Sequence, residues 1–365
     1  MKEIKKVFLS SIHQNAGKTM IALGLYKVFK ENKLKAAFMK PIGQKIVTVN
    51  DQHLDKDSYL MGEVYHCWKR FKEMSPITLK RGFTERYIFN PQEEVLRAKI
   101  EQSFKRLTQD KEAIIIEGTG HAGVGSVIDF SNADVAKLLG SKVIIISEGG
   151  IGKAIDEIML NKSLFDFKEV EVVGVIINKV MPEKYERIKR ILSRGLKNKG
   201  IKLLGVIPID PILSSPTVKQ VMQQLDLQLL CGKSNLNTHV KNTIVAAMEP
   251  QNVLSYLKDG TLVITSGDRI DNILVAISSH IIRQAGKYRI AGIILTGGMI
   301  PDQRIIDLLK KSNIAVLLSS DDTYTAAGKI ESMTCKIEKT DKDKISEAAR
   351  LVKKYVDTKT ILKNL

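Results

Sequence analysis

The chain has 365 residues, 44% of them hydrophobic and 27% charged, a composition typical of a globular protein with two compact domains. The formal net charge is +17, but the basic residues are scattered and only 5% of residues are aromatic. A basic, solvated surface therefore explains the charge better than a nucleic-acid groove does. No apolar run reaches the roughly 18–20 residues of a membrane span, and the first strand begins too early to leave room for a signal peptide. The three cysteines are widely spaced, so we expect a cytoplasmic protein without a disulfide framework or zinc site.

The first 210 residues alternate between short apolar runs and segments with helical periodicity. Continuous apolar runs separated by helices are typical of a doubly wound parallel α/β sheet that is covered on both faces. Such sheets bind ligands at the carboxyl ends of their strands. The predicted strands are 7–9, 36–39, 113–116, 143–146, 172–177 and 202–206. The predicted helices are 20–30, 57–63, 93–107 and 182–198.

A candidate phosphate-binding loop follows the first strand, with the sequence S-S-I-H-Q-N-A-G-K-T over residues 10–19. Gly17 would let the backbone approach an anion, Lys18 would place a charge on the outer phosphates, and the Thr19 hydroxyl can ligate Mg²⁺. The helix that follows adds its dipole and its unpaired N–H groups. The order strand, loop, helix therefore predicts a nucleotide site.

Polar residues also follow the later strands, at the edge where a ligand is expected. Lys40 and Glu117 each come directly after a strand, Asp57 stands at the start of a helix, and Asn178 could present its amide to a purine. Each has a structural alternative: Lys40 could be a solvated strand end, Asp57 a helix cap, and Asn178 a loop residue. Their occurrence in one order after a Gly-Lys-Thr loop favours a functional role.

Residues 1–210 resemble the dethiobiotin-synthetase-like P-loop family, which includes the synthetase domains of cobyrinic and cobyric acid amidation enzymes. The resemblance rests on Gly17-Lys18-Thr19, Lys40-Pro41, Asp57, Glu117-Gly118-Thr119-Gly120, Asn178-Lys179 and Gly205-Val206-Ile207-Pro208. It implies ATP and Mg²⁺ as cofactors, and a homodimer, since related enzymes complete their acceptor site across a two-fold interface.

The resemblance also implies a role for each matching residue. Thr19, Asp57 and Glu117 would surround the metal ion. Lys18 and Lys40 would be catalytic, since they would stabilise the transferred phosphoryl group. The positions matching Asn178 and Pro208 hold adenine in that family. The residues expected to bind the nucleotide are His13, Asn15, Ala16, Gly17, Lys18, Thr19, Met20, Asn178, Lys179 and Pro208.

The chain departs from the family pattern in two places. Neither Ser11 nor Ile12 is the usual opening glycine of the loop, and Asn15 replaces another loop glycine. The stretch 121–126 also differs from the biotin-precursor sequence of the family. We therefore expect ATP binding, but not biotin synthesis.

A smaller α/β domain is predicted over 253–335, after a linker region at 211–252. Strands at 261–265, 291–295 and 315–318 alternate with helices at 271–283 and 304–311. The pattern resembles the DRTGG domain, a regulatory module, although Gly267-Asp268-Arg269 and Thr296-Gly297-Gly298 stand apart here. If the strands before them are parallel neighbours, both loops could bind an anionic small molecule at one sheet edge. Equally, the glycines could make turns and Arg269 could pair with Asp271 or Asp302.

A P-loop domain followed by a DRTGG-like domain is the arrangement ahead of the catalytic domain in long bacterial phosphate acetyltransferases. Only a basic helix, over 336–365, is predicted beyond it, so we expect no acetyltransferase activity. The favoured hypothesis is a Mg²⁺-dependent ATP-hydrolysing protein with a ligand-sensing second domain and a regulatory role near acyl-phosphate metabolism. The alternative is an ATP-dependent ligase-like enzyme that phosphorylates a carboxylate or carbamate. A nucleic-acid binder is the least favoured hypothesis.

Overall fold

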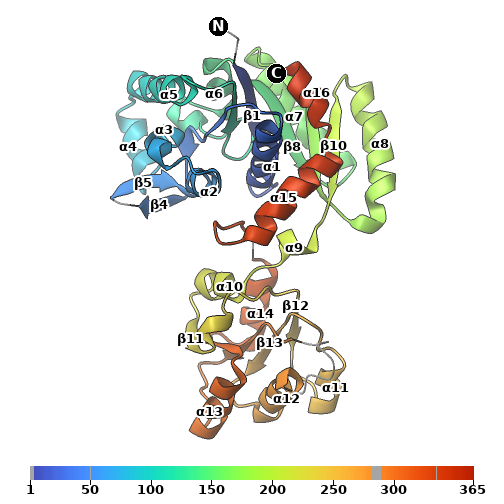
Figure 1. The fold of residues 1–365 in the computed structure, drawn as a ribbon. Coiled ribbons are helices and arrows are strands. Elements are labelled where there is room, and N and C mark those ends of the chain that lie inside the picture. The colour runs from blue at the N-terminus through green and yellow to red at the C-terminus, as the bar shows by residue number, and fades with distance from the viewer. Residues whose placement is uncertain (1–3, 50, 282–288, 334) are drawn as a thin grey trace. The chain divides into compact units, whose positions relative to one another are not determined.

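Buried runs of isoleucine, valine and leucine form the central sheet of the computed structural model, which describes residues 4–49, 51–281, 289–333 and 335–365 (Figure 1). The chain divides into two units, Met1–Asp210 with Ile337–Leu365, and Pro211–Lys336. The sheet of the first unit has six parallel strands. In sheet order they are β10 (Leu203–Pro208), β9 (Val172–Val180), β8 (Lys142–Glu148), β1 (Lys5–Ser11), β7 (Ala113–Glu117) and β2 (Ala36–Met39).

Helices lie on both faces of this sheet, which confirms the predicted doubly wound parallel architecture. In Figure 1, α1 and α15 lie side by side in front of the strands, and α7 lies behind them. The larger helices are α1 (Lys18–Glu31), α5 (Glu93–Thr108), α6 (Asn132–Leu138), α7 (Gly152–Phe167), α8 (Tyr185–Asn198), α15 (Lys342–Tyr355) and α16 (Thr358–Asn364).

Between β2 and α5 the chain forms a small subassembly that supports one side of the sheet's carboxyl edge. A parallel pair joins β3 (Ile42–Gly43) to β6 (Ile77–Thr78), and an antiparallel pair joins β4 (Ile46–Val49) to β5 (Gln52–Asp55). Its helical segments are α2 (Lys56–Tyr65), η1 (Trp68–Arg70), α3 (Phe71–Met74) and α4 (Phe83–Phe89). Two further short 3₁₀ segments of the first unit are η2 (Ser126–Ile128) and η3 (Pro182–Lys184).

The second unit has a five-stranded sheet in which only β11 runs antiparallel to its neighbour. In sheet order its strands are β11 (Gln228–Cys231), β15 (Ala315–Leu318), β14 (Gly292–Thr296), β13 (Thr261–Ser266) and β12 (Asn242–Val245). Alternating side chains of these strands enter two separate hydrophobic clusters, one on each face. The helical segments are α9 (Pro211–Ser214), α10 (Val218–Gln224), η4 (Lys233–Asn235), α11 (Pro250–Leu254), α12 (Ile270–Ile281), α13 (Gln303–Ser312) and α14 (Thr323–Glu331).

The structure corrects the predicted division of the chain. The expected linker, 211–252, supplies both edge strands of the second sheet, and Val218 and Val221 of α10 are fully buried. An edge strand has a single partner strand and tolerates polar residues, so its sequence resembles that of a linker. The C-terminal segment, expected as a separate basic helix, belongs to the first unit because the apolar side of α15 packs on α1.

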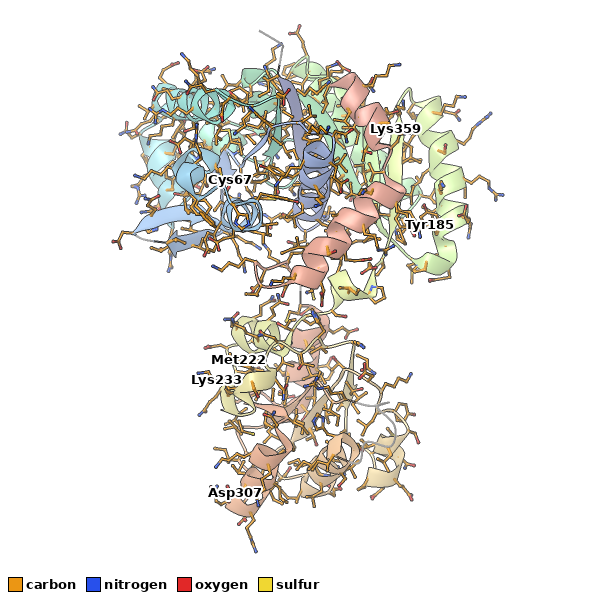
Figure 2. The ribbon with its side chains drawn as sticks, in the orientation of Figure 1. Cys67, Tyr185, Met222, Lys233, Asp307 and Lys359 are labelled. Carbon is orange, nitrogen blue, oxygen red and sulfur yellow. The ribbon has the colours of Figure 1, made fainter. Side chains whose placement is uncertain are left out.

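The helix predicted over 271–283 is observed as α12, and residues 282–283 lie outside the described residues. The cysteines are free thiols, with Cys67 in the first unit (Figure 2). Within the described ranges, none of the helices has the length and apolar character that a membrane crossing requires.

Candidate functional site

The candidate phosphate loop connects β1 to α1 at the carboxyl edge of the first sheet. Gly17 has a φ of 101° and precedes the first turn of α1, whose N–H groups receive no side-chain cap. A Cβ atom on Gly17 would lie 2.1 Å from Asn178 Nδ2, so both the backbone conformation and the close contact require glycine. Asn15 has a φ of 64°, a left-handed conformation that asparagine tolerates better than most residues. Asparagine can therefore adopt the left-handed conformation that this position of the loop requires.

Lys18 is buried in the first turn of α1, and its ammonium donates a hydrogen bond to Ser11 Oγ at 2.7 Å. Burial lowers the pKa of Lys18 to about 8; Lys40 lowers it as well, whereas Glu117 and Asp57 act in the opposite direction. Ser11, which stands near the position of the missing opening glycine, thus gives the ammonium a partner inside the loop.

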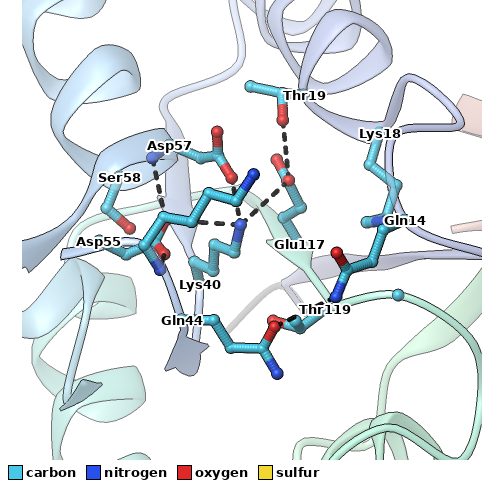
Figure 3. A network of polar contacts seen from close by, with 12 residues as sticks. Gln14, Lys18, Thr19, Lys40, Gln44, Asp55, Asp57, Ser58, Glu117 and Thr119 are labelled. Atoms are coloured by element: carbon cyan, nitrogen blue, oxygen red, sulfur yellow. Dashed lines mark hydrogen bonds and ion pairs between the residues drawn. The ribbon is translucent and has the colours of Figure 1, made fainter. Parts of the chain in front are cut away.

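Lys40 lies at the centre of three carboxylates (Figure 3). Its Nζ atom bonds Asp57 Oδ2 and lies 3.4 Å from Asp55 Oδ1 and 3.5 Å from Glu117 Oε1. Burial lowers the pKa of Lys40, but attraction by Asp57, Glu117 and Asp55 outweighs burial and the net direction is upward. Three carboxylates around one ammonium leave an excess of negative charge when all are ionised, and such a cluster attracts a further cation.

Glu117 ends β7 and is almost completely buried. Its Oε1 atom accepts a hydrogen bond from Thr19 Oγ1 at 2.9 Å, whereas its buried Oε2 atom has no hydrogen-bond partner among the described residues. Burial raises the pKa of Glu117 to about 7, and the charge of Asp57 adds to this rise against the opposing effect of Lys40. A buried polar atom without a partner is costly, so this oxygen is suited to bind a ligand.

Asp55 belongs to the same cluster, although it was not among the predicted site residues. Its buried carboxylate caps α2 by accepting a hydrogen bond from the N–H of Asp57 at 2.9 Å. Burial raises its pKa, against the attraction of Lys40. The two aspartates flanking Lys56 were the available signal, because an N-cap residue and a first-turn carboxylate are separated by this spacing.

The predicted metal ligands are only partly assembled. Thr19 and Glu117 are in contact, but the ammonium of Lys40 lies between Glu117 and Asp57. Across the described ranges, no three His, Cys, Asp or Glu side chains form a group that could hold a metal ion. A divalent cation here would therefore be bound first by the Thr19 hydroxyl and Glu117. Asp57 would be a less direct ligand, because the ammonium of Lys40 stands beside it.

Asn178 and Lys179, at the end of β9, contact the phosphate loop. Asn178 Nδ2 donates to the carbonyl of Ala16 at 2.9 Å, and Lys179 Nζ donates to the carbonyl of Asn15 at 2.7 Å. The side chain of Asn178 is buried, so the amide that was expected to face a purine is already bonded to the loop. These two residues thus bind the two consecutive backbone carbonyl groups that precede Gly17.

The other predicted nucleotide-binding residues lie at the same edge. His13 Nε2 is 3.3 Å from Glu148 Oε2, and Met20 is buried in the first turn of α1. Pro208 ends β10, where its register partner is Val180 of β9. The predicted site residues therefore lie mainly at the carboxyl ends of five strands, β1, β2, β7, β9 and β10. Pro208 stands on β10, an edge strand of the sheet.

The glycine loops of the second unit meet as predicted, because β13 and β14 are parallel neighbours. Their backbone groups are nevertheless engaged in turns. The N–H groups of Gly267, Gly297 and Gly298 donate to carbonyls of Thr296, Asp321 and Ser319. Arg269 bonds both carboxylate oxygens of Asp271, at 2.9 and 2.8 Å. Arg269 thus pairs with Asp271, as the structural alternative expects, and an anionic ligand at this edge would have to replace these bonds.

Comparisons with known proteins cover both units. Residues 5–217 match the AAA domain family, and residues 220–333 match the DRTGG domain family. The phosphate acetyltransferase of Nitratidesulfovibrio vulgaris is 28% identical over 361 residues, which are 96% of this chain and 50% of that protein. The phosphate acetyltransferase of Synechocystis sp. is 27% identical over 366 residues, 98% of this chain and 51% of that protein. The chain thus spans about half the length of the curated relatives it matches.

Similar solved structures include the CBS and DRTGG domains of the regulatory region of Clostridium perfringens pyrophosphatase, complexed with its activator diadenosine tetraphosphate. That match has a TM-score of 0.27 and 19% identity, and covers 43% of this chain and 76% of that chain. A putative plasmid partition protein from Borrelia burgdorferi bound to AMPPNP has a TM-score of 0.38 and 15% identity, and covers 57% and 88% of the two chains. By the match over residues 5–217, the chain belongs to the AAA domain family, and a DRTGG domain follows over residues 220–333.

Proposed function

We propose that the first unit binds and hydrolyses MgATP, and that the DRTGG domain senses a small anionic ligand, so that the chain regulates acyl-phosphate metabolism. The observation that carries the ATP part is the buried Oε2 atom of Glu117, which has no hydrogen-bond partner among the described residues and lies beside the Thr19–Glu117 contact. A carboxylate and a hydroxyl oxygen are suitable ligands for Mg²⁺.

The residues at the edge fit the remaining parts of MgATP. The uncapped N-terminus of α1 offers N–H groups to phosphate oxygens, and Lys18 adds a positive charge. Lys40, held by Asp55 and Asp57, would oppose the charge that develops on a transferred phosphoryl group. Bound Mg²⁺ would neutralise phosphate charge, with Thr19 and Glu117 as its first ligands.

The regulatory part of the proposal rests on the domain match and on the relatives. Residues 220–333 match the DRTGG domain, and the curated relatives over this chain are phosphate acetyltransferases. We propose a homodimer as the working assembly and the cytoplasm as its place. Sedimentation with MgATP present would contradict the dimer if the only species had the mass of one chain.

Calorimetry with Lys18→Ala tests the ATP site. The substitution removes the ammonium beside the loop, and we expect MgATP affinity to fall by about 100-fold or more, the scale of about 3 kcal/mol for a lost charged contact. Lys27→Ala is the matched control, because Lys27 is an exposed lysine on the same helix. Equal MgATP affinity in Lys18→Ala and the wild type would contradict the proposed site.

A ligase-like enzyme is the second candidate. Gln14 and Gln44 are exposed and lie 3.4 Å apart at the edge that carries Lys18 and Lys40, where amide groups could orient an acceptor carboxylate (Figure 3). A ligase would release ADP only when a carboxylate or carbamate acceptor is added. A regulator would hydrolyse ATP at the same rate with and without one.

A further inference from the structure

Two side chains near the end of β9 hold carbonyl groups of the phosphate loop. Asn178 and Lys179 bond the consecutive carbonyls of Ala16 and Asn15, at 2.9 and 2.7 Å. Lys179 has a φ of 54°, an uncommon backbone conformation for lysine that persists only where surrounding contacts impose it. These bonds fix the orientation of the two peptide groups just before Gly17.

Glu148, at the end of β8, also takes part in these contacts. Its Oε1 atom accepts a hydrogen bond from Lys179 Nζ at 2.7 Å, and its Oε2 atom lies 3.3 Å from His13 Nε2. His13 belongs to the loop, so Glu148 connects two points of the loop, His13 directly and Asn15 through Lys179. Neither Glu148 nor Lys179 belongs to the cluster of carboxylates around Lys40.

The exposure of these side chains argues against a purely structural role. The side chains of Lys179 and Glu148 are 44% and 30% exposed. Ion pairs with this much solvent access contribute little to folding stability, because water screens the charges and holding the side chains costs entropy. The contacts nevertheless lie directly on the backbone that would surround phosphate.

We infer that Glu148 and Lys179 are positioning residues that set the phosphate loop in its anion-binding conformation, and that Lys179 does not recognise adenine. The inference rests on the proposed MgATP site and assigns Glu148 a role in it. Holding the carbonyls of Asn15 and Ala16 in place would leave the loop N–H groups free to turn toward a polyphosphate. Affinity would then depend on the phosphates and not on the base.

Calorimetry with two ligands tests this role, since Mg-tripolyphosphate carries the phosphates of MgATP without adenine. For Lys179→Ala and for the nearly isosteric Glu148→Gln, we expect affinity for both ligands to fall by about tenfold, the usual size of a lost charge-assisted hydrogen bond. The double variant should lose less than the product of the two single losses, because both substitutions break one connection.

Lys153→Ala is the matched control. Lys153 follows β8 on α7, its side chain is 82% exposed, and its ion pair with Glu157 does not involve the loop. It should change neither affinity, and the melting temperatures of all variants should stay near that of the wild type.

The possible outcomes separate this inference from the proposed function. A loss of MgATP affinity with unchanged tripolyphosphate affinity would overturn the inference and assign Lys179 a contact with the nucleoside part of ATP. Unchanged affinity for both ligands in Glu148→Gln would overturn the role of Glu148, even if Lys18→Ala still weakens MgATP binding. Absence of MgATP binding to the wild type would instead reject the proposed function.

Discussion

At the scale of single residues, burial brings the pKa of one basic group and one acidic group toward neutral pH. Burial is the largest cause of both shifts, bringing the pKa of Lys18 down to about 8 and that of Glu117 up to about 7. The ordinary values of lysine and glutamate lie far from neutral pH on opposite sides. The two groups that would meet phosphate and metal therefore change charge within the physiological range, which is a common property of functional sites.

These shifts predict a bell-shaped pH dependence of MgATP affinity. Below about pH 7 the protonated Glu117 is a poor metal ligand, so affinity rises as the pH increases through 7. Above about pH 8 Lys18 loses the proton that attracts phosphate, so affinity falls again. Each limb should approach a tenfold change per pH unit if one proton is involved, and calorimetry from pH 5.5 to 9.5 measures it.

Glu117→Gln is the control for the acidic limb. Glutamine cannot ionise, so the variant should bind MgATP more weakly and lose the dependence between pH 6 and 7.5, while the alkaline limb of Lys18 remains. An acidic limb that persists in Glu117→Gln would assign the titration to another group.

At the scale of secondary-structure elements, the contact between α1 and α15 determines how the phosphate-loop helix is held. A Cβ atom on Gly24 of α1 would lie 2.4 Å from Val352 Cγ2 and 3.0 Å from the carbonyl of Ala348. Glycine in a helix interior normally costs about 1 kcal/mol relative to alanine, so close approach of the helices explains its presence. The C-terminal helix thus packs against the element that begins with Lys18.

Gly24→Ala should therefore destabilise the first unit by about 1–3 kcal/mol, because overpacking outweighs the better helix propensity of alanine. Gly328→Ala in α14 is the matched control, since Gly328 is an exposed helical glycine with no atom within 4 Å of its added Cβ. That control should raise stability by about 0.5–1 kcal/mol. Thermal unfolding of both variants gives the comparison, and a stabilised Gly24→Ala would contradict the close packing of α1 on α15.

At the scale of the whole molecule, the first unit is completed by residues that follow the second unit in the chain. Val356 pairs with Gly205 of β10, the N–H of Asp357 donates to the carbonyl of Leu204 at 2.7 Å, and Lys5 Nζ bonds the carbonyl of Leu362 at 2.8 Å. The second unit is therefore an insertion between β10 and α15 of the first, with one covalent connection at each end.

Removal of residues 337–365 should lower the melting temperature of the first unit by about 10 °C or more, since the buried faces of α1 and β10 lose their cover. MgATP binding should weaken with it. Excised residues 211–336 should keep their own cooperative transition, because their two hydrophobic clusters are internal. Calorimetric unfolding of the three proteins measures this, and an unchanged first transition in the truncated chain would contradict the role of α15 and α16.

Local sequence patterns were sufficient for the six parallel strands of the first unit and for the loop between β1 and α1. Apolar runs such as 113–116 and 143–146 become buried strands because every residue in them can enter a core, and the Gly-Lys-Thr loop lies between adjoining elements. The edge strands β11 and β12 were missed because an edge strand with one partner carries a weaker pattern.

The partners of the site residues depend on contacts between distant parts of the chain. Asn178 and Lys179 were correctly predicted to stand at a strand end, but their bonds reach across 162 and 164 residues to Ala16 and Asn15. Asp55 joins Lys40, and Glu148 joins Lys179, only after the strands are ordered in the sheet. Periodicity and loop chemistry act between neighbours in sequence, and so they determined the elements and the residue types at the edge. The pairing of charged side chains and the size of each pKa shift depend on the order of strands in the sheet and on the packing of α1 and α2. Only the tertiary structure decides them, because these long-range contacts form only in the folded chain.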